Sequence, residues 1–360
     1  MCSTQETLDQ RSERRISVGI EATAVKYDAG VQLSGKDWLC LHRNENLFVD
    51  PNWAIELTKN MAHRFSISLY PDPECGELRA AIAELYGVSS ENVFVGNGSD
   101  EVLSDLLALL RDSYERIATQ DVCFNVYYLL ARRFNYHHVK IPGNTFLTGQ
   151  LAVEDWDGLS IVDSPNSVTG VQLNHENLLA LKKNDHSFLI WDNAYGEFAG
   201  DVPPSPIEKN VVLVRSFSKF YGLAGLRIGY CIAHSSIIKE LLERKDIFNV
   251  NAVAQLMALE ALQRREELMG FSSQMIECRN SLVNQLQNFG FQVHKPSGNF
   301  VLTKHPTFSG QEIESALLKY NVAVRRFPGK LTENHVRITV PPVAGLSRLA
   351  HALEEVLNSE

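Results

Sequence analysis

The sequence predicts an α/β fold with a mostly parallel sheet in the larger part of the chain. Apolar runs of strand length alternate with helical patterns from about residue 90 to 235, and this alternation is typical of parallel sheets. Four of the apolar runs end immediately before a loop that is rich in polar residues or glycine. Because α/β folds bind ligands at the carboxyl ends of their strands, the four loops mark the expected functional site.

The first run, residues 92–95, precedes a glycine-rich turn and an amphipathic stretch at residues 102–110. Gly98 permits a tight turn from strand to helix, and Ser99 or Asp100 falls at the helix N-terminus. Free backbone N–H groups at such a position bind anions. The turn is neither GxGxxG nor a Walker loop, so by itself it is only weak support for a nucleotide site.

The second run, residues 159–162, leads into the loop 163–170, which reads Asp-Ser-Pro-Asn-Ser-Val-Thr-Gly. Asp, Ser, Pro, Asn and Gly all favour turns, so an ordinary β-turn is the simpler interpretation. In the functional interpretation, Asn166 supplies an amide donor to a ligand oxygen.

The third run, residues 187–191, ends at Asp192, with Tyr195 three residues later. A carboxylate at the end of a buried strand is costly unless it meets a cation or hydrogen-bond donors. A pyridinium nitrogen is such a partner, and a carboxylate beside it keeps the ring protonated. Considered alone, the segment is better explained by a helix cap or a turn.

The fourth run, residues 211–214, precedes Lys219, which follows the hydroxyl residues Ser216 and Ser218 and is followed eight residues later by Arg227. This composition suits a phosphate-bearing aldehyde, because the amine forms a Schiff base while hydroxyl and guanidinium groups bind the phosphate. A desolvated lysine near another cation has a lowered pKa and is nucleophilic near neutral pH. The alternative is a surface lysine in a serine-rich turn, and the motif alone does not decide.

In this order and spacing, the four loops resemble those of fold-type-I pyridoxal-phosphate enzymes, specifically the histidinol-phosphate aminotransferase group of class II aminotransferases. The resemblance runs from about Leu41 to Thr339. It includes five further strings: Asn44-Glu45-Asn46, Tyr70-Pro71-Asp72-Pro73, Gly76-Glu77-Leu78-Arg79, Gly298-Asn299-Phe300 and Val336-Arg337-Ile338-Thr339. The implied fold is aspartate aminotransferase-like, with a large, mostly parallel-sheet domain and a small α+β domain.

The resemblance implies pyridoxal 5′-phosphate as the cofactor and a homodimer with shared active sites. It implies that Lys219 is the Schiff-base lysine and proton carrier, that Asp192 pairs with the pyridine nitrogen, and that Tyr195 bonds the phenolic oxygen. Phe124 stands where the family stacks a tyrosine on the ring. The other implied cofactor contacts are Gly98, Ser99, Asp100, Asn166, Ser216, Arg227 and, from the neighbouring subunit, Tyr70.

For the substrate, the resemblance implies contacts with Arg337, Arg325 and Asn166. Arg337 matches the arginine that binds the α-carboxylate, for which a guanidinium fork is suited; the alternative is a strand arginine in a surface ion pair. Arg325 matches a side-chain phosphate contact. The Tyr-x-Pro-Gly segment of the family is replaced by residues 20–30, whose carboxylates would suit a cationic side chain instead, and the loop 163–170 lacks the second proline.

These departures leave the reaction open. We expect an aminotransferase of the histidinol-phosphate aminotransferase type with a different substrate. The alternatives are a dehydratase or cyclase that acts by β/γ-elimination and ring closure on a hydroxylated guanidino amino acid such as hydroxyarginine, as in enduracididine or capreomycidine formation, an amino-acid decarboxylase, and a non-catalytic cofactor-binding sensor. We also expect residues 20–30 to gate the site.

The predicted domains are an N-terminal segment at residues 1–50 packing on the small domain and the active site, a large cofactor-binding domain at 51–275 and a small C-terminal domain at 276–360. Long helical patterns are predicted at 236–263 and 266–289, and a last helix at 345–357. The first 16 residues have a flexible composition.

The composition excludes several other functions. A net charge of −9 gives no basic surface for nucleic acid. The six cysteines show no CxxC pairing and the eleven histidines no HExxH motif, so we predict no metal and reduced thiols. Neither a signal sequence nor an apolar run of membrane length is visible, and the expected location is the cytoplasm.

Overall fold

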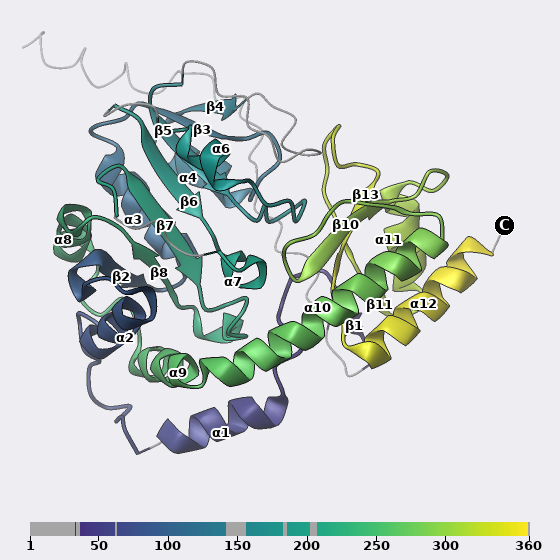
Figure 1. Ribbon diagram of the computed structural model, residues 1–360, viewed down its shortest axis with the longest axis horizontal. Helices are drawn as coiled ribbons and strands as arrows, with labels where there is room; N and C mark the ends of the chain where they lie inside the picture. The colour runs from purple at the N-terminus through teal and green to yellow at the C-terminus, as the bar shows by residue number, and fades with distance from the viewer. Residues whose placement is uncertain are drawn as a thin grey trace, which may run out of the picture.

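The computed structural model describes residue 33 and residues 37–61, 63–141, 156–182, 186–201 and 207–358. They form a larger lobe that holds a long sheet and a smaller lobe built mainly from C-terminal residues (Figure 1). Helix α10, Arg265–Asn288, runs from the larger lobe to the smaller one. The two segments for which flexibility and gating are predicted, residues 1–16 and 20–30, lie outside the described residues.

The larger lobe contains a seven-stranded sheet in the order β2-β8-β7-β6-β5-β3-β4. β3 to β7 pair in parallel, whereas β8 runs antiparallel between β2 and β7. The mostly parallel sheet of the predicted α/β fold is therefore confirmed. The strands are β2 (Val93–Gly96), β3 (Arg116–Gln120), β4 (His137–Ile141), β5 (Leu159–Asp163), β6 (Phe188–Asp192), β7 (Val211–Ser216) and β8 (Gly229–Ile232).

Both faces of this sheet are covered, so its central strands β5, β6 and β7 are buried along their whole length. In β6, Leu189 and Trp191 belong to one apolar cluster and Phe188 and Ile190 to the other, as the two-residue period of a strand requires. The first cluster includes residues of helices α1 (Pro51–Met61), α2 (Gly76–Tyr86), α6 (His175–Leu179), α7 (Gly196–Ala199) and α9 (Ala252–Gln263). The second includes residues of α3 (Ser99–Leu110), α4 (Val126–Arg133) and α8 (Ser235–Arg244).

The four loops that follow the predicted strands meet at one edge of the sheet. β2, β5, β6 and β7 all point the same way, because β2 and β7 flank the same antiparallel strand. Asp163 and Asp192 are register partners at the ends of β5 and β6. Gly229 is the register partner of both Gly96 and Ser216. The carboxyl ends of these strands therefore bring together residues that lie more than a hundred positions apart in the sequence.

The smaller lobe contains a four-stranded antiparallel sheet in the order β12-β13-β10-β9. Its strands are β9 (Gln292–Val293), β10 (Phe300–Lys304), β12 (Arg325–Arg326) and β13 (His335–Thr339), accompanied by helices α11 (Gly310–Leu318) and α12 (Val343–Leu357). A short parallel pair, β1 (Leu39–Cys40) with β11 (Val322–Ala323), attaches the N-terminal segment to this lobe. Residues 42–45 continue from β1 toward the larger sheet.

A continuous helix was predicted at residues 236–263, and this prediction was wrong because the segment forms two helices. α8 ends at Arg244, and Lys245 has an extended backbone. Asn251 then caps α9, because its side chain accepts a hydrogen bond from the Ala254 N–H at 2.9 Å. α10 passes through residue 275, and the domain boundary placed there stays a prediction.

The last helix, α12, begins at Val343, two residues before the predicted start, directly after Pro342 at its N-cap. Among the helices of the described ranges, none combines the length and apolarity that a membrane span needs.

Candidate active site

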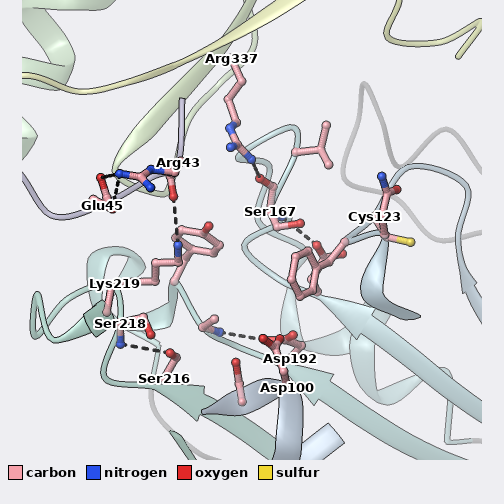
Figure 2. A pocket seen from close by; sticks show the side chains of 18 of the residues that line it. Arg43, Glu45, Asp100, Cys123, Ser167, Asp192, Ser216, Ser218, Lys219 and Arg337 are labelled. Atoms are coloured by element: carbon pink, nitrogen blue, oxygen red, sulfur yellow. Dashed lines mark hydrogen bonds and ion pairs between the residues drawn. The ribbon is translucent and has the colours of Figure 1, made fainter. Parts of the chain in front are cut away.

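A cavity of about 260 Å³ lies between the carboxyl edge of the seven-stranded sheet and the small lobe. In Figure 2, Lys219, Asp192 and Arg337 lie on three different sides of it. Most residues singled out in the sequence line this cavity: Ser99, Asp100, Phe124, Asp192, Tyr195, Ser216, Lys219, Arg227, Arg325 and Arg337.

One side of the cavity, which we call the sheet wall, consists of Asp163, Asp192, Ser216, Lys219 and the N-terminus of α3. Its centre is Asp192, which is 5% exposed. The Tyr127 hydroxyl donates to Asp192 Oδ2 at 2.7 Å, and the Ala194 N–H donates to Oδ1 at 3.1 Å. The carboxylate is therefore held in a fixed orientation at the end of β6.

Burial makes both carboxyls of the sheet wall unusually weak acids. Burial raises the pKa of Asp192 to about 6, although the bonds from Tyr127 and Ala194 act in the opposite direction. Burial raises the pKa of Asp163 to about 7, against the lowering effect of the bonds from Ser167, and the Asp192 charge adds to the rise. A cation placed beside this pair would favour the ionised forms.

Lys219 extends from the loop after β7 toward the segment that links the two lobes. Its Nζ donates to the backbone oxygens of Arg43 at 3.3 Å and Asn44 at 3.4 Å, and it lies 5.5 Å from the centroid of the Tyr195 ring. Asn44 adopts a left-handed backbone with φ 55°, and its side-chain amide donates to the Tyr195 hydroxyl at 3.0 Å. Asn44 thus connects the lysine and the tyrosine.

Backbone N–H groups, a guanidinium and two hydroxyls gather at one end of the sheet wall. α3 begins at Ser99 without a side-chain cap at Gly98, so its first N–H groups are available to a ligand. A Cβ on Gly98 would lie 2.8 Å from Arg227 Nη2, and one on Gly229 would lie 2.3 Å from the Ser99 nitrogen.

Because these two glycines have no side chain, β8 and Arg227 can approach the N-terminus of α3 closely. Arg227 also forms an ion pair with Asp100 at 2.9 Å. Ser216 and Ser218 line the same cavity, and Ser216 Oγ accepts a hydrogen bond from the Ser218 N–H at 3.1 Å. The combination suits a phosphate group.

The opposite side, which we call the arginine wall, consists of Arg43, Glu45, Arg325, Phe327 and Arg337. Arg325 and Arg337 are register partners on β12 and β13. Their guanidinium carbons lie 5.7 and 5.0 Å from the centroid of the Phe327 ring, at cation–π distances. Arg43 pairs with Glu45 at 3.0 Å. Three guanidinium groups on one wall are suited to an anionic ligand.

Arg337 is buried and held by the backbone of two other segments. It donates from Nη1 to the Ser167 oxygen at 2.8 Å and from Nη2 to the His42 oxygen at 3.0 Å. In Figure 2 it lies across the cavity from Asp192, and its guanidinium points toward Ser167. This burial differs from the surface ion pair considered as the alternative for this residue.

Three of the predicted site residues do not line the cavity. Gly98 caps α3 behind Ser99. Asn166 is buried in its own loop, where its amide donates to the Val122 and Asp163 oxygens and its carbonyl accepts from the N–H groups of Val168 and Thr169. Its neighbour Ser167 lines the cavity instead.

Tyr70 lies elsewhere, on the surface. It is 83% exposed, and its ring stacks on Phe248 with centroids 4.5 Å apart. Its implied role in a neighbouring subunit's site stays a prediction.

Sequence analysis missed Tyr127, Phe327 and the role of Asn44. Tyr127 bonds Asp192 across a sequence separation of 65 residues, and its position on α4 gives no motif. Phe327 follows the arginine pair of β12 and carried no signal of its own. Asn44 was part of a matching string, and an asparagine is a residue type that tolerates a left-handed backbone. Within the described ranges, no group of three or more His, Cys, Asp or Glu side chains could hold a metal ion.

A second cavity of about 430 Å³ adjoins the first and shares Cys123, Asn125, Val168 and Phe327 with it. Its far side includes Lys140 and residues 328–332. Phe327 therefore stands between the two cavities.

Comparisons with known proteins agree with this geometry. The model of the family described as aminotransferase class I and II matches residues 36–355. The chain is 30% identical over 343 residues to the histidinol-phosphate aminotransferase of Clostridium botulinum (strain Okra), covering 92% of this chain and 96% of that protein. It is 29% identical to the enzyme of the same name from Microcystis aeruginosa, with the same coverage.

Solved structures share the fold. The histidinol-phosphate aminotransferase of Sinorhizobium meliloti, solved with pyridoxal-5′-phosphate, superposes with a TM-score of 0.81 at 23% identity, over 89% of this chain and 91% of that one. The L-threonine-O-3-phosphate decarboxylase of Porphyromonas gingivalis superposes with a TM-score of 0.77 at 24% identity, over 89% and 99% of the two chains.

Proposed function

We propose that this chain, which belongs to the class I and II aminotransferases, transfers the amino group of an amino acid that carries a second anionic group. The enzyme depends on pyridoxal 5′-phosphate. The observation that carries the substrate proposal is the arginine wall, where Arg325 and Arg337 pair in register and line the same cavity as Lys219.

The residues of the sheet wall fit this cofactor. Its pyridine nitrogen would meet Asp192, a buried carboxylate whose raised pKa a neighbouring cation would lower. Its phosphate would be held by the N-terminus of α3, Ser216 and Arg227, and its ring would lie beside Phe124. Lys219 would hold its aldehyde carbon through the side-chain amine. When bound, the cofactor supplies an electron sink that makes the Cα proton of an amino acid acidic.

The protein then contributes orientation and proton transfer. Asp192 would keep a proton on the pyridine nitrogen, and the hydrogen bonds from Tyr127 and the Ala194 N–H fix the orientation of that carboxylate. Once the substrate amine has replaced it on the aldehyde carbon, the Lys219 amine would remove the Cα proton and return it to that carbon, two bonds away, as a general base and acid. Arg337 binds the α-carboxylate and so fixes which bond at Cα faces the ring. Asp192 and Arg337 are both buried, which limits the access of water to them.

The second anionic group of the substrate would lie between Arg325 and Arg43. A dicarboxylic keto acid would serve as the amino acceptor on the same wall. Because the adjoining cavity continues past Phe327, side chains longer than that of aspartate can be accommodated. The family's Tyr-x-Pro-Gly segment is absent and the loop 163–170 lacks the second proline, so we expect histidinol phosphate to be a poor substrate.

A mass-spectrometric assay tests this proposal. The purified protein is supplied with a panel of amino acids that includes aspartate, glutamate, O-phosphoserine, O-phosphothreonine, leucine, arginine, hydroxyarginine and histidinol phosphate, each with and without 2-oxoglutarate. We expect keto products from the dianionic members, and only when the acceptor is present. Products lighter by water or carbon dioxide, formed without acceptor, would instead indicate elimination or decarboxylation. Efficient turnover of histidinol phosphate or leucine would contradict the proposed substrate class.

We also propose a homodimer in which Tyr70 reaches the partner's cofactor phosphate. The proposal is supported by large apolar side chains exposed around Tyr70: Ile67 at 93%, Leu69 at 69%, Ile247 at 70% and Phe248 at 42%. Exposed apolar groups of this kind are typical of surfaces that another chain covers. Mixing inactive Lys219→Ala and Tyr70→Ala subunits should restore part of the activity, because one site of the hybrid contains neither change. A monomeric mass at assay concentration would contradict it.

A further inference from the structure

A fully buried ion pair lies outside the cavity, beneath the two loops of the sheet wall. Arg215 Nη1 and Glu197 Oε1 are 2.9 Å apart, and their side chains are 1% and 0% exposed. Glu197 lies on α7, two residues after Tyr195, and Arg215 lies on β7 immediately before Ser216. The pair therefore connects two loops close to where they leave the sheet. One loop carries Tyr195 after Asp192, and the other carries Lys219.

The guanidinium of Arg215 is enclosed on its other sides. Its Nη2 donates to the backbone oxygen of Asp201 at 2.7 Å, just beyond the end of α7. Its carbon lies 5.4 Å from the centroid of the Tyr86 ring. The Tyr86 hydroxyl is 2.8 Å from that of Tyr230, the register partner of Arg215 on β8. Arg215 thus contacts α7, α2 and the neighbouring strand, and has no direct contact with the cavity.

Asp201 extends this connection to a third loop. Its Oδ2 accepts a hydrogen bond from the Asn193 amide at 2.7 Å, and the same amide donates to the Ser164 backbone oxygen at 2.6 Å. The side-chain amide of Gln172 donates to Asp201 Oδ1 at 2.6 Å. The network therefore links the loops that follow β5, β6 and β7, each of which supplies residues to the sheet wall.

Stability alone is a weak reason for such a pair. Removing two charges from water costs several kcal/mol per ion, and replacing both partners of a buried pair with apolar residues is often neutral or stabilising. Removing only one partner leaves an uncompensated buried charge and is strongly destabilising. What an apolar pair cannot reproduce is the directional hydrogen bond that Arg215 Nη2 donates to the Asp201 backbone oxygen.

We propose that Arg215 and Glu197 are positioning residues, which set the Lys219 amine in its orientation relative to Asp192 and Tyr195. The proposal rests on the proposed roles of those three residues. It predicts that the pair governs the protonation behaviour and rate of the site rather than the stability of the fold.

The test is the double variant Arg215→Met/Glu197→Leu, which removes both charges together. We expect it to fold and to bind the cofactor. Its kcat should fall about tenfold or more while the KM for the amino acid stays within about twofold, and the pH midpoint of the bound cofactor's absorbance change should shift by about half a unit or more. A matched control, Arg244→Met/Glu240→Leu, removes an exposed pair on α8 and should leave all three quantities unchanged.

A folded double variant with wild-type kcat and a wild-type absorbance titration would overturn the proposal and leave the pair a purely structural one. If the double variant fails to fold, Arg215→Gln/Glu197→Gln carries the test, because it removes both charges together and keeps polar side chains of similar size. The same shift is then expected, and a wild-type titration overturns the proposal. The absorbance titration needs bound cofactor but no substrate. It therefore measures the effect of the pair on protonation of the site even if the proposed substrate class is wrong.

Discussion

The two walls of the cavity are held in different ways. The acidic residues of the sheet wall stand at the ends of fully buried strands, in register with one another, and nearby side chains and backbone groups bind their oxygens. In the arginine wall, Arg43 and Glu45 lie on a linking segment with side chains about a third exposed, 35% and 38%. Only Arg337 is anchored as deeply as the carboxylates.

This difference indicates which residues of the site can move or be replaced without disturbing the sheet. A residue at the end of a central parallel strand cannot move without moving its neighbours across the sheet. A residue on a linking segment, or on a two-residue edge strand such as β12, has fewer such constraints. We therefore expect changes in the sheet wall to affect all substrates alike, and changes in the exposed part of the arginine wall to discriminate between them.

The largest effect should come from Lys219→Ala. Turnover should be abolished for every substrate, because the amine that moves the Cα proton is gone, and borohydride should no longer trap the cofactor on the protein. Peptide mapping after reduction gives the readout, with Lys239→Ala on the exposed face of α8 as the control. Recovery of a reduced cofactor adduct on another lysine would contradict the assignment.

Asp192→Ala should come next. The cofactor should still bind through the other contacts, but exchange of the Cα proton with solvent should slow about 100-fold or more, as when a preorganised charge is removed from an active site. Asp192→Glu should retain part of the rate, since the charge survives in a displaced position. Deuterium exchange followed by NMR measures both. An unchanged exchange rate in Asp192→Ala would show that ring protonation does not depend on this carboxylate.

The register-paired arginines of β12 and β13 should separate a general from a selective substrate contact within the arginine wall. Arg337→Ala should raise the KM for every amino acid by about 10- to 100-fold, because a hydrogen bond to a charged group contributes about 1.5–3 kcal/mol. Arg325→Ala should raise it only for substrates with a second anionic group. Steady-state kinetics with aspartate and alanine as the pair would show this. A uniform loss in both variants would remove the distinction between a general and a selective arginine.

The smallest effect concerns the pH dependence of the cofactor-free protein. The pKa values of Asp163 and Asp192 are raised to about 7 and about 6, so between about pH 4 and 7 the folded state binds more protons than the unfolded state. Their contribution to stability is therefore present at low pH and is lost as the pH rises through those values.

Asp163→Asn should remove part of this loss. Relative to the variant, the free energy of unfolding of the wild type should fall between pH 5 and pH 8 by an amount on the order of 1–3 kcal/mol. Urea unfolding of both proteins at the two pH values measures the difference. Parallel curves would mean that Asp163 is ionised throughout this range.

The sequence was sufficient for the sheet wall because each part of it is local. A buried strand followed directly by Asp192 or by the Lys219 loop is visible in consecutive residues, and parallel pairing then brings the loops together. The family and the cofactor were also predicted and confirmed. Contacts that depend on packing were not visible. Tyr127 reaches Asp192 only because α4 lies across the sheet, and Asn166 turns into its own loop while Ser167 lines the cavity.

The Asn44 contacts have a consequence for the order in which the protein is made. Its bonds to Tyr195, Lys219, Asn299 and Thr339 span 151, 175, 255 and 295 residues. Contacts of such separation are slow to form, because the chain must first close long loops. During synthesis, the seven-stranded sheet can be completed once β8 has left the ribosome, whereas Asn44 must wait for β13. The candidate active site is therefore expected to assemble only after the sheet that carries most of its residues.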